Sequence, residues 1–249
     1  MGSSIKKIAA AKAGIIKKNI PTIISNQSPI VKRILDAKCV SNNSNVIWSA
    51  ESFTVSSSRK SIIQKLSKKS IEYPFPNLIG THQISNAMTA ISTLNYLKVP
   101  DKHICEGLTS TYWPARLQEI NNGSLCELIK KYNINNKLWI DGGHNEDASI
   151  QLSKSVGFMN KKNLHIIFGC LEHKDHRSFL RNLVAVASSL SIVEIDNQPS
   201  SLIKTVAVSS AKEAGWKKIY SACSIRDAIE NICSQYEGLT PHVSILICG

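Results

Sequence analysis

Residues 137–145 read Lys-Leu-Trp-Ile-Asp-Gly-Gly-His-Asn, and this stretch decides the fold of the second half of the chain. A short apolar run stops at Asp141 and is followed by two glycines. This pattern predicts a buried strand over residues 137–141 that ends in a polar turn. The residues that follow, 145–159, carry apolar side chains at helical spacing, so we expect a helix there.

The same alternation of strand and helix patterns continues to residue 249. We expect strands at 164–168, 191–195, 218–220 and 243–248, and helices at 175–190, 201–214 and 224–236. Such alternation favours an α/β fold, a mostly parallel sheet with helices on its faces. Ligands of these sheets bind beyond the carboxyl ends of the strands. The polar segments 141–145 and 172–175 should lie at that edge.

The first half of the chain is less regular. We expect helices at 5–17, 29–37, 82–97 and 101–109, a strand at 21–24, and short antiparallel strands between residues 46 and 71. Trp113-Pro114 breaks the pattern, which places a domain boundary near residues 112–116. Two domains are therefore expected, residues 1–112 and residues 113–249.

The composition is that of a globular protein, with 43% hydrophobic and 19% charged residues among 249. The seven cysteines include no CxxC pair and no zinc-finger spacing, so we expect free buried thiols in a reducing cytosol. No apolar run is long enough for a signal peptide core or a membrane span. These features indicate a cytoplasmic protein without a membrane partner.

The formal net charge is +12, which can indicate a nucleic acid partner. The lysines are scattered as pairs, however, and no aromatic residues interleave with them as stacking platforms for bases. Solvated surface lysines therefore explain the charge better than a nucleic acid does. Small anionic ligands would also suit it.

Several common catalytic motifs are absent from the sequence. There is no GxxxxGK[ST], and no glycine is followed by lysine anywhere, so the usual backbone cradle for nucleotide phosphates is missing. There is also no GxGxxG, no HExxH and no GxSxG. These absences argue against a dinucleotide fingerprint, a helical zinc protease site and a hydrolase nucleophile elbow.

Five segments nevertheless match one family in order. They are IAAAKAGIIK at 8–17, GTHQISNA at 80–87, WPARLQ at 113–118, DGGHN at 141–145, and FG with KD between 168 and 175. They resemble IAxEKAGIIK, GxHQxxNA, WPGRLQ, DGAHN and FGxxxDKD of the folylpolyglutamate synthase/dihydrofolate synthase family, relatives of the Mur ligases. Each segment alone is weak evidence, but five in order along nearly the whole chain are a strong signal.

The resemblance implies a remnant of a Mur-ligase-type central ATP-binding domain at 1–112, truncated so that the N-terminal phosphate-loop region is missing. It further implies a Rossmann-like, mostly parallel-sheet C-terminal glutamate-ligase domain at 113–249. The family is a set of ligases of folate biosynthesis and one-carbon metabolism. With ATP and Mg²⁺ they add L-glutamate to folate or dihydropteroate through an acyl phosphate.

The resemblance also assigns candidate ATP contacts. Asn86 would contact the base, with an exposed helical Asn as the alternative. Arg116 would hold the nucleotide at the domain break, and could otherwise be a surface arginine. Asp141 could accept hydrogen bonds from ribose hydroxyls or cap a helix, although Asn145 could cap instead. His144 looks like the family's nucleotide-proximal histidine, and could equally be structural.

Other matched residues have weaker assignments. Lys12 corresponds to a lysine that the family carbamylates near its magnesium site, but Ala11 replaces the preceding acidic residue. The family's magnesium-binding Glu and His would lie before residue 1, so we assign no metal ligand and keep a surface lysine as the alternative. His82, Lys174 and Asp175 are candidates for substrate-proximal positions, with a helix cap as the alternative for Asp175.

Three functional hypotheses follow from these patterns. The chain could be a ligase fragment, inactive alone, that acts with a separately encoded N-terminal half. It could be a decayed, non-catalytic remnant with an open sheet edge near residues 21–24. It could also be a basic nucleotide-binding or nucleic-acid-binding module without catalysis.

Overall fold

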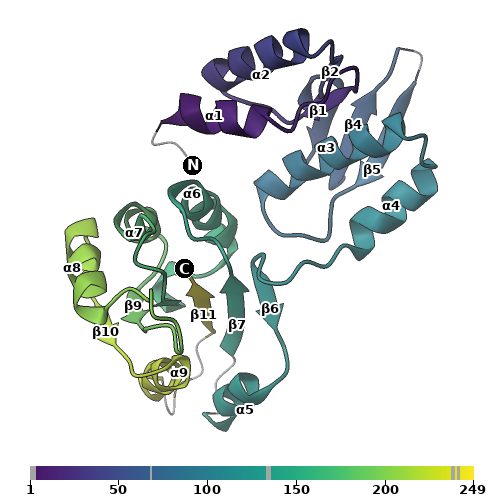
Figure 1. The fold of residues 1–249 in the computed structure, drawn as a ribbon. Coiled ribbons are helices and arrows are strands. Elements are labelled where there is room, and N and C mark those ends of the chain that lie inside the picture. Colours follow the sequence, from purple (N-terminus) through teal and green to yellow (C-terminus); the bar gives the residue numbers. More distant parts are fainter. Residues whose placement is uncertain (1–3, 68, 133–135, 237–238, 240–241) are drawn as a thin grey trace. The chain divides into compact units, whose positions relative to one another are not determined.

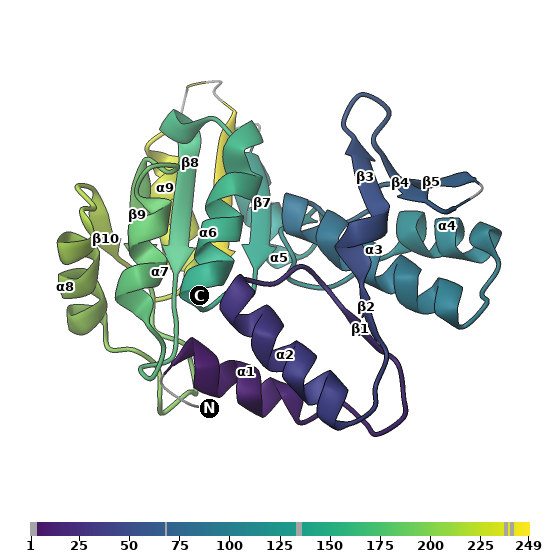
Figure 2. The same cartoon turned by 90° about the horizontal axis from the view of Figure 1, so that it is seen from above.

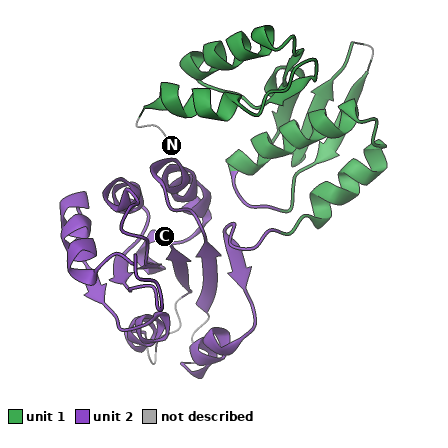
Figure 3. Cartoon of the chain, in the orientation of Figure 1, with its two compact units in different colours: residues 1–77, 81–112 green, residues 78–80, 113–249 purple. Residues whose placement is uncertain are grey.

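The structure is a computed structural model that describes residues 4–67, 69–132, 136–236, 239 and 242–249. The chain divides into two compact units (Figure 3). Unit 1 contains residues 1–77 and 81–112, and unit 2 contains residues 78–80 and 113–249.

Unit 2 is built on a six-stranded sheet with the order β10-β9-β8-β11-β7-β6 (Figure 1). All neighbouring pairs are parallel except β6 with β7, which is antiparallel. The strands are β6 (Gln118–Ile120), β7 (Asn136–Asp141), β8 (Leu164–Phe168), β9 (Ser189–Ile192), β10 (Ile219–Ser221) and β11 (Val243–Cys248). The prediction of an α/β fold with a mostly parallel sheet is confirmed.

Helices cover both faces of this sheet. On one face lie α6 (Glu146–Ser155), α7 (His176–Leu183) and α8 (Lys204–Ala214), with the 3₁₀ turns η2 (Val156–Phe158) and η3 (Lys161–Asn163) following α6. On the other face lie α5 (Ser124–Lys131) and α9 (Ile225–Ser234). Because side chains alternate along a strand, Ile166 of β8 packs toward α7 while Ile167 packs toward α9. Burial on both faces explains why β8 is a continuous apolar run with one exception, His165.

Unit 1 holds two small sheets (Figure 2). One contains β1 (Thr22–Ile24) and β2 (Val46–Trp48), and the other contains β3 (Phe53–Ser56), β4 (Ser61–Lys65) and β5 (Ser70–Pro74). The helices are α1 (Ile5–Ala13), α2 (Pro29–Ser41), α3 (Thr81–Tyr96) and α4 (Asp101–Ser110), and the 3₁₀ turn η1 (Ser49–Ser52) follows β2. The β3-β4-β5 sheet packs on α3 and α4 around buried Ile62, Tyr73 and Ile91.

Two sequence predictions about local structure were wrong. Residues 46–48 were expected to be antiparallel, but β2 pairs in parallel with β1. The reason is that α2 connects the two strands as a crossover helix, which returns the chain in the same direction. The helix expected at 175–190 ends at Leu183, and the strand expected at 191–195 begins at Ser189. The main-chain N–H of Ser188 already pairs with the carbonyl oxygen of Leu164, so the chain has left the helix there.

The strand β6 and the helix α5 were not predicted. Both are short, and their pattern in the sequence is interrupted by the turn at Gly123, whose φ is +94°. Among the residues that the structure describes, no helix has the length and apolar character needed to cross a membrane.

Candidate functional site

A cavity of about 520 Å³ lies beyond the carboxyl ends of the parallel strands of unit 2. Its walls come from the ends of β7, β8 and β11, the segment after β9, and the first turn of α9. This is the edge at which open parallel sheets bind ligands. The lining residues that can make polar contacts include Asp141, Glu194, Asp196, Ser224 and Arg226.

The carboxylate of Asp141 holds two backbone segments together at this edge. Its Oδ2 accepts a hydrogen bond from the N–H of Leu117 (2.8 Å), and its Oδ1 accepts one from the N–H of Gly143 (2.8 Å). A Cβ on Gly143 would lie only 2.8 Å from that Oδ1 and 2.9 Å from the Cβ of Ala148, so the turn needs a residue without one. Asp141 therefore clamps the connector at 115–118 to the end of β7.

The connector itself is shaped by further contacts with the end of β7. The carbonyl oxygen of Ala115 accepts a hydrogen bond from the N–H of Gly142 (2.9 Å), and the N–H of Ala115 donates to Oε1 of Gln118 (3.0 Å). Leu117 is buried in the core of unit 2, whereas Arg116 is exposed and forms no ion pair within the described part of the chain. The connector thus presents the Arg116 guanidinium to solvent on a fixed backbone.

Two residues of the connector adopt left-handed backbone conformations, Ala115 with φ 55° and Leu117 with φ 42°. An L-residue with a Cβ pays about 1 kcal/mol or more in this region, whereas glycine does not. We expect Ala115→Gly to raise the free energy of unfolding of unit 2 by about 1 kcal/mol. Urea denaturation of the variant measures this difference.

A matched control for that substitution is Ala148→Gly in α6. Glycine in a helix costs about 1 kcal/mol relative to alanine, so this variant should be less stable than the parent. If Ala115→Gly also lowers the unfolding free energy, then the left-handed backbone of Ala115 does not cost stability in the folded protein.

His144 and Asn145 follow Asp141 on the turn into α6. The side chain of Asn145 caps the helix by accepting the N–H of Ala148 (2.8 Å), so Asp141 is not the cap. His144 is exposed, and its Nδ1 lies 3.0 Å from the carbonyl oxygen of Gly142. Because a carbonyl oxygen only accepts, Nδ1 is the donor in this contact.

Lys174 and Asp175 lie between β8 and α7. Asp175 is the N-cap of α7, since its Oδ1 accepts the N–H of Ser178 (3.1 Å), and this hydrogen bonding lowers the pKa of its carboxyl group. A capping role accounts for this residue as well as a substrate contact would. Lys174 is half-buried, and its main-chain N–H donates to the carbonyl oxygen of Leu171 (3.1 Å).

The remaining predicted contacts lie on α3 in unit 1. Asn86 is exposed and donates from Nδ2 to Oε1 of Gln83 (3.0 Å), while Nε2 of Gln83 donates to Nε2 of His82 (3.0 Å). Gln83 therefore links the two candidate residues on one helix. Within unit 2 the backbone of the connector, which carries Arg116, is bonded to Asp141, and His144 lies on the turn that follows.

Lys12 is exposed in the last turn of α1. Over the part of the chain that the structure describes, no group of three or more His, Cys, Asp or Glu side chains could hold a metal ion. Lys12 has no such group beside it within these described residues, and we derive no step through a metal.

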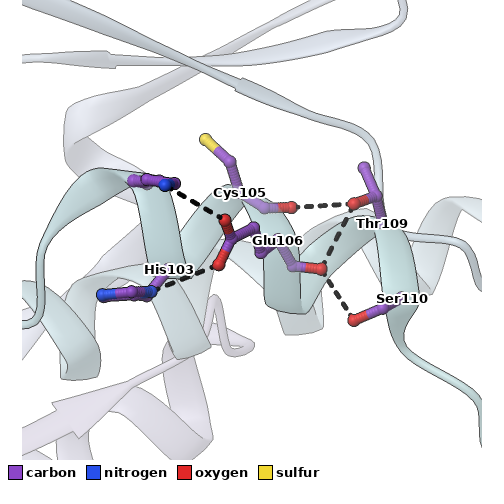
Figure 4. Close-up of polar contacts among 6 residues, drawn as sticks. His103, Cys105, Glu106, Thr109 and Ser110 are labelled. Carbon is purple, nitrogen blue, oxygen red and sulfur yellow. Dashed lines mark hydrogen bonds and ion pairs between the residues drawn. The ribbon is translucent and has the colours of Figure 1, made fainter.

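Helix α4 of unit 1 carries a cluster of polar side chains (Figure 4). Nδ1 of His103 lies 3.2 Å from Oε2 of Glu106 on the exposed surface. Thr109 and Ser110 donate from their hydroxyls to main-chain carbonyl oxygens of Cys105 and Glu106. These hydroxyls bond back to carbonyl oxygens one turn earlier in the same helix, a local pattern common for Ser and Thr, so the contacts give no sign of a catalytic centre.

The known proteins that are similar to this chain carry closely related names. No model of a known protein family matches the chain. The dihydrofolate synthase/folylpolyglutamate synthase of Bacillus subtilis is 26% identical over 82% of this chain and 47% of its own length. The folylpolyglutamate synthase of Lacticaseibacillus casei is 25% identical over 100% of this chain and 56% of its own length.

This chain is similar to folylpolyglutamate and dihydrofolate synthases. It spans about half the length of these curated relatives, and it matches their C-terminal part. The folylpolyglutamate synthase of Mycobacterium tuberculosis, solved with ADP and AMPPCP, superposes with a TM-score of 0.80 at 22% identity. The match covers 100% of this chain and 57% of the length of that enzyme. The Escherichia coli protein solved with ADP and DHPP has a TM-score of 0.79 and 18% identity over 100% of this chain and 54% of its own.

Several residues that line the cavity of unit 2 were not predicted from the sequence. The sequence patterns did not indicate that Glu194, Asp196 and Arg226 line the cavity. Glu194 and Asp196 follow β9 and Arg226 lies in the first turn of α9, and only the sheet order brings these segments beside β7. Gly249 could have been found, because it directly follows the last predicted strand. A Cβ there would collide with the carbonyl oxygen of Gly169, so the backbones of β8 and β11 approach too closely for any side chain.

Proposed function

We propose that this chain forms the C-terminal part of an ATP-dependent ligase that adds L-glutamate to folate or dihydropteroate through an acyl phosphate. The observation that carries this proposal is the likeness of the whole chain, in sequence and in fold, to folylpolyglutamate synthases. The domain assignment follows from it, with residues 1–112 as part of the ATP-binding domain and residues 113–249 as the glutamate-ligase domain. The five buried free cysteines suit a reducing cytoplasm.

In this proposal the connector at 115–118 is a nucleotide-binding element. Arg116 is exposed on a backbone that Asp141 fixes, so its guanidinium can bind phosphate oxygens with little loss of backbone freedom. His144, on the turn that follows Asp141, is a further candidate contact. The amide of Asn86 offers a donor and an acceptor that would suit the edge of an adenine base.

The ligase reaction also requires groups that these 249 residues do not encode. Phosphoryl transfer depends on electrostatic positioning of the triphosphate, for which the family resemblance implies a phosphate loop. The sequence contains no GxxxxGK[ST] motif. We therefore expect glutamylation only when a polypeptide bearing such a loop is supplied, and nucleotide affinity without turnover when this chain is alone.

The test measures incorporation of labelled glutamate into a folate and into dihydropteroate, with ATP and Mg²⁺. The chain is assayed alone and after co-expression with the N-terminal part of the Lacticaseibacillus casei enzyme. The mixture should glutamylate and the chain alone should not. In parallel, Arg116→Ala should weaken ADP binding about tenfold, because a charge-assisted contact is lost.

The matched control for Arg116→Ala is Arg181→Ala, which removes another exposed arginine of unit 2 without touching the connector. ADP binding should be unchanged in the control. Unaided glutamylation by the chain would contradict the need for a separate phosphate loop. Equal ADP affinity in the parent and in Arg116→Ala would remove this residue from the nucleotide site.

A further inference from the structure

The chain contains one Asn-Gly dipeptide, Asn122-Gly123, in the turn between β6 and α5 (Figure 1). The residue after an asparagine decides how closely its main-chain nitrogen can approach the asparagine side chain. Glycine has no Cβ, so its nitrogen meets the least steric resistance on the way to the Cγ carbon. Every other asparagine of the chain is followed by a residue with a Cβ. The sequence therefore singles out Asn122 for attack by its own backbone.

The fold leaves both reacting groups of this dipeptide free. Asn122 and Gly123 are exposed. Within the described part of the chain, the side chain of Asn122 makes no hydrogen bond and the N–H of Gly123 donates to no acceptor. The carbonyl oxygen of Gly123 is the group that α5 uses, since it accepts the N–H of Glu127 (3.1 Å). The nitrogen of Gly123 can therefore reach the side chain of Asn122 without the loss of a hydrogen bond.

Asn43-Ser44 in unit 1 offers a comparison, because serine is also a small residue. Here the fold occupies both reacting groups. Nδ2 of Asn43 donates to Oδ1 of Asn19 (2.9 Å), and the N–H of Ser44 donates to the carbonyl oxygen of Cys39 (2.9 Å). Two hydrogen bonds must break before the nitrogen of Ser44 can attack, so the structure protects this asparagine.

Asp141-Gly142 is a second protected dipeptide. An aspartate before a glycine can undergo the corresponding ring closure with loss of water. Both carboxylate oxygens of Asp141 accept main-chain N–H groups, and the N–H of Gly142 donates to the carbonyl oxygen of Ala115 (2.9 Å). Neither group is available here, in contrast to Asn122-Gly123.

We propose that Asn122 is a site of spontaneous covalent modification, at which the chain converts an asparagine into aspartate and isoaspartate. The nitrogen of Gly123 loses its proton to water and bonds to Cγ of Asn122. The bond from Cγ to Nδ2 breaks, and Nδ2 takes up a proton and leaves as ammonia. Water then opens the succinimide ring at either of its two carbonyl carbons. Opening at one carbon gives aspartate, and opening at the other gives isoaspartate, in which the main chain runs through Cγ.

The isoaspartyl product changes the backbone at the start of α5. Its main chain is longer by one methylene group within a turn of three residues, 121–123. This turn is spanned by a contact from Sγ of Cys126 to the carbonyl oxygen of Ile120 (3.2 Å). The added methylene displaces the carbonyl oxygen of Gly123 from the N–H of Glu127, so the first turn of α5 loosens.

The experiment follows the modification by mass and does not depend on any enzymatic activity of the chain. The intact 249-residue protein is incubated at neutral and at mildly alkaline pH and digested with trypsin, and the peptide 117–130 is fragmented in a mass spectrometer. We expect exchange of NH₂ for OH at residue 122, about tenfold or more faster than at Asn43, where hydrogen bonds must break first. The rate should rise with pH, because the deprotonated nitrogen of Gly123 is the nucleophile. The isoaspartyl fraction should accept a methyl group from S-adenosylmethionine in the presence of an isoaspartyl methyltransferase.

Incubation in urea separates the contribution of the fold from that of the sequence. Unfolding should raise the rate at Asn43 about tenfold or more, because its protecting hydrogen bonds are lost. The rate at Asn122 should change less than about threefold, because the folded turn already leaves its groups free.

A variant and a matched control locate the reaction. Asn122→Gln lengthens the side chain by one methylene, so ring closure should slow about tenfold or more. Asn121→Gln changes the exposed neighbour and should leave the modification of Asn122 unchanged. Both positions are exposed, so both variants should fold, which circular dichroism verifies.

Three results would overturn the proposal. The first is a rate at Asn122 in the folded protein no higher than at Asn43, and the second is a rate at Asn122 that rises in urea as much as at Asn43. The third concerns the isoaspartyl fraction, which its added negative charge separates on an anion exchanger. Hydrogen exchange at the amide of Glu127 should be faster in this fraction, and unchanged exchange would show that the product does not loosen α5.

Discussion

Unit 2 is expected to lose about 3 kcal/mol of stability as the pH falls from about 6.5 to about 4, because of one buried histidine. His165 is 3% exposed on the central strand β8, and burial, with a smaller effect from the charge of Lys218, lowers its pKa to about 4. The unfolded chain binds the proton at an ordinary pKa near 6.5, so protons in this range favour unfolding. The contribution is present above pH 6.5 and is lost toward pH 4.

The neutral ring is fixed by contacts with two other elements. Nδ1 of His165 lies 2.7 Å from the hydroxyl of Ser189 on β9, and Nε2 lies 2.8 Å from the hydroxyl of Tyr236, which follows α9. One nitrogen of a neutral imidazole donates and the other accepts, and both hydroxyls can do either. A charged ring would be buried away from water, and this desolvation, with the smaller effect of Lys218, is the physical origin of the lowered pKa.

The measurement is the free energy of unfolding in urea at a series of pH values, for the parent and for His165→Gln. Other carboxylates titrate in both proteins, so the difference between the two curves isolates His165. The parent should be more stable at pH 7, and its advantage should shrink by about 3 kcal/mol by pH 4. His144→Gln, at an exposed histidine of the same unit, is the control for removing an imidazole. A difference that stays constant with pH would show that His165 does not titrate in this range.

Removing the carboxylate of Asp141 is expected to have a second large effect. Asp141→Ala should lower the unfolding free energy of unit 2 by about 3 kcal/mol, because two main-chain N–H groups lose a charged acceptor. Asp141→Asn keeps one oxygen acceptor, so it should cost less, about 2 kcal/mol. Both variants should also release the connector and weaken ADP binding, since Arg116 would no longer be held on a fixed backbone.

The control for this series is Asp147→Ala, which removes an exposed carboxylate in the first turn of α6. It should cost less than about 1 kcal/mol, the usual worth of a charge near a helix terminus. Hydrogen exchange at the amide of Leu117 gives a local readout, because this N–H loses its partner in Asp141→Ala. Unchanged protection there would show that Asp141 does not clamp the connector, even if the protein were destabilised.

Much of the secondary structure of unit 2 was predicted from the pattern of apolar residues along the sequence. The runs that became β7, β8 and β11 were predicted almost to the residue, because strands buried on both faces are continuous apolar runs. The boundary between α7 and β9 was wrong, because Ala187 and Leu190 suit a helical stripe as well as a strand. In unit 1 the direction of β2 was wrong, since a single strand's sequence does not say on which side its partner lies.

The candidate site was only partly readable from the sequence. The assignments of Asn86, Arg116, Asp141 and His144 to a nucleotide remain predictions. The structure adds that Asp141 accepts two main-chain N–H groups without capping a helix, and that Asp175 does cap a helix, the alternative considered for it. His165 could not be identified, because its partners lie 24 and 71 residues away in the chain.

The sequence by itself determined the alternation of strands and helices in unit 2 and the order of five family-like segments, because both are local patterns along the chain. Only the tertiary structure decided which of the polar residues are already paired. Asp141 meets the N–H of Leu117 across 24 residues of chain, and the cavity beside it forms because the last strand, β11, inserts between β7 and β8. Hydrogen bonds between distant segments depend on sheet order, and sheet order is a property of the packed core that no local pattern specifies.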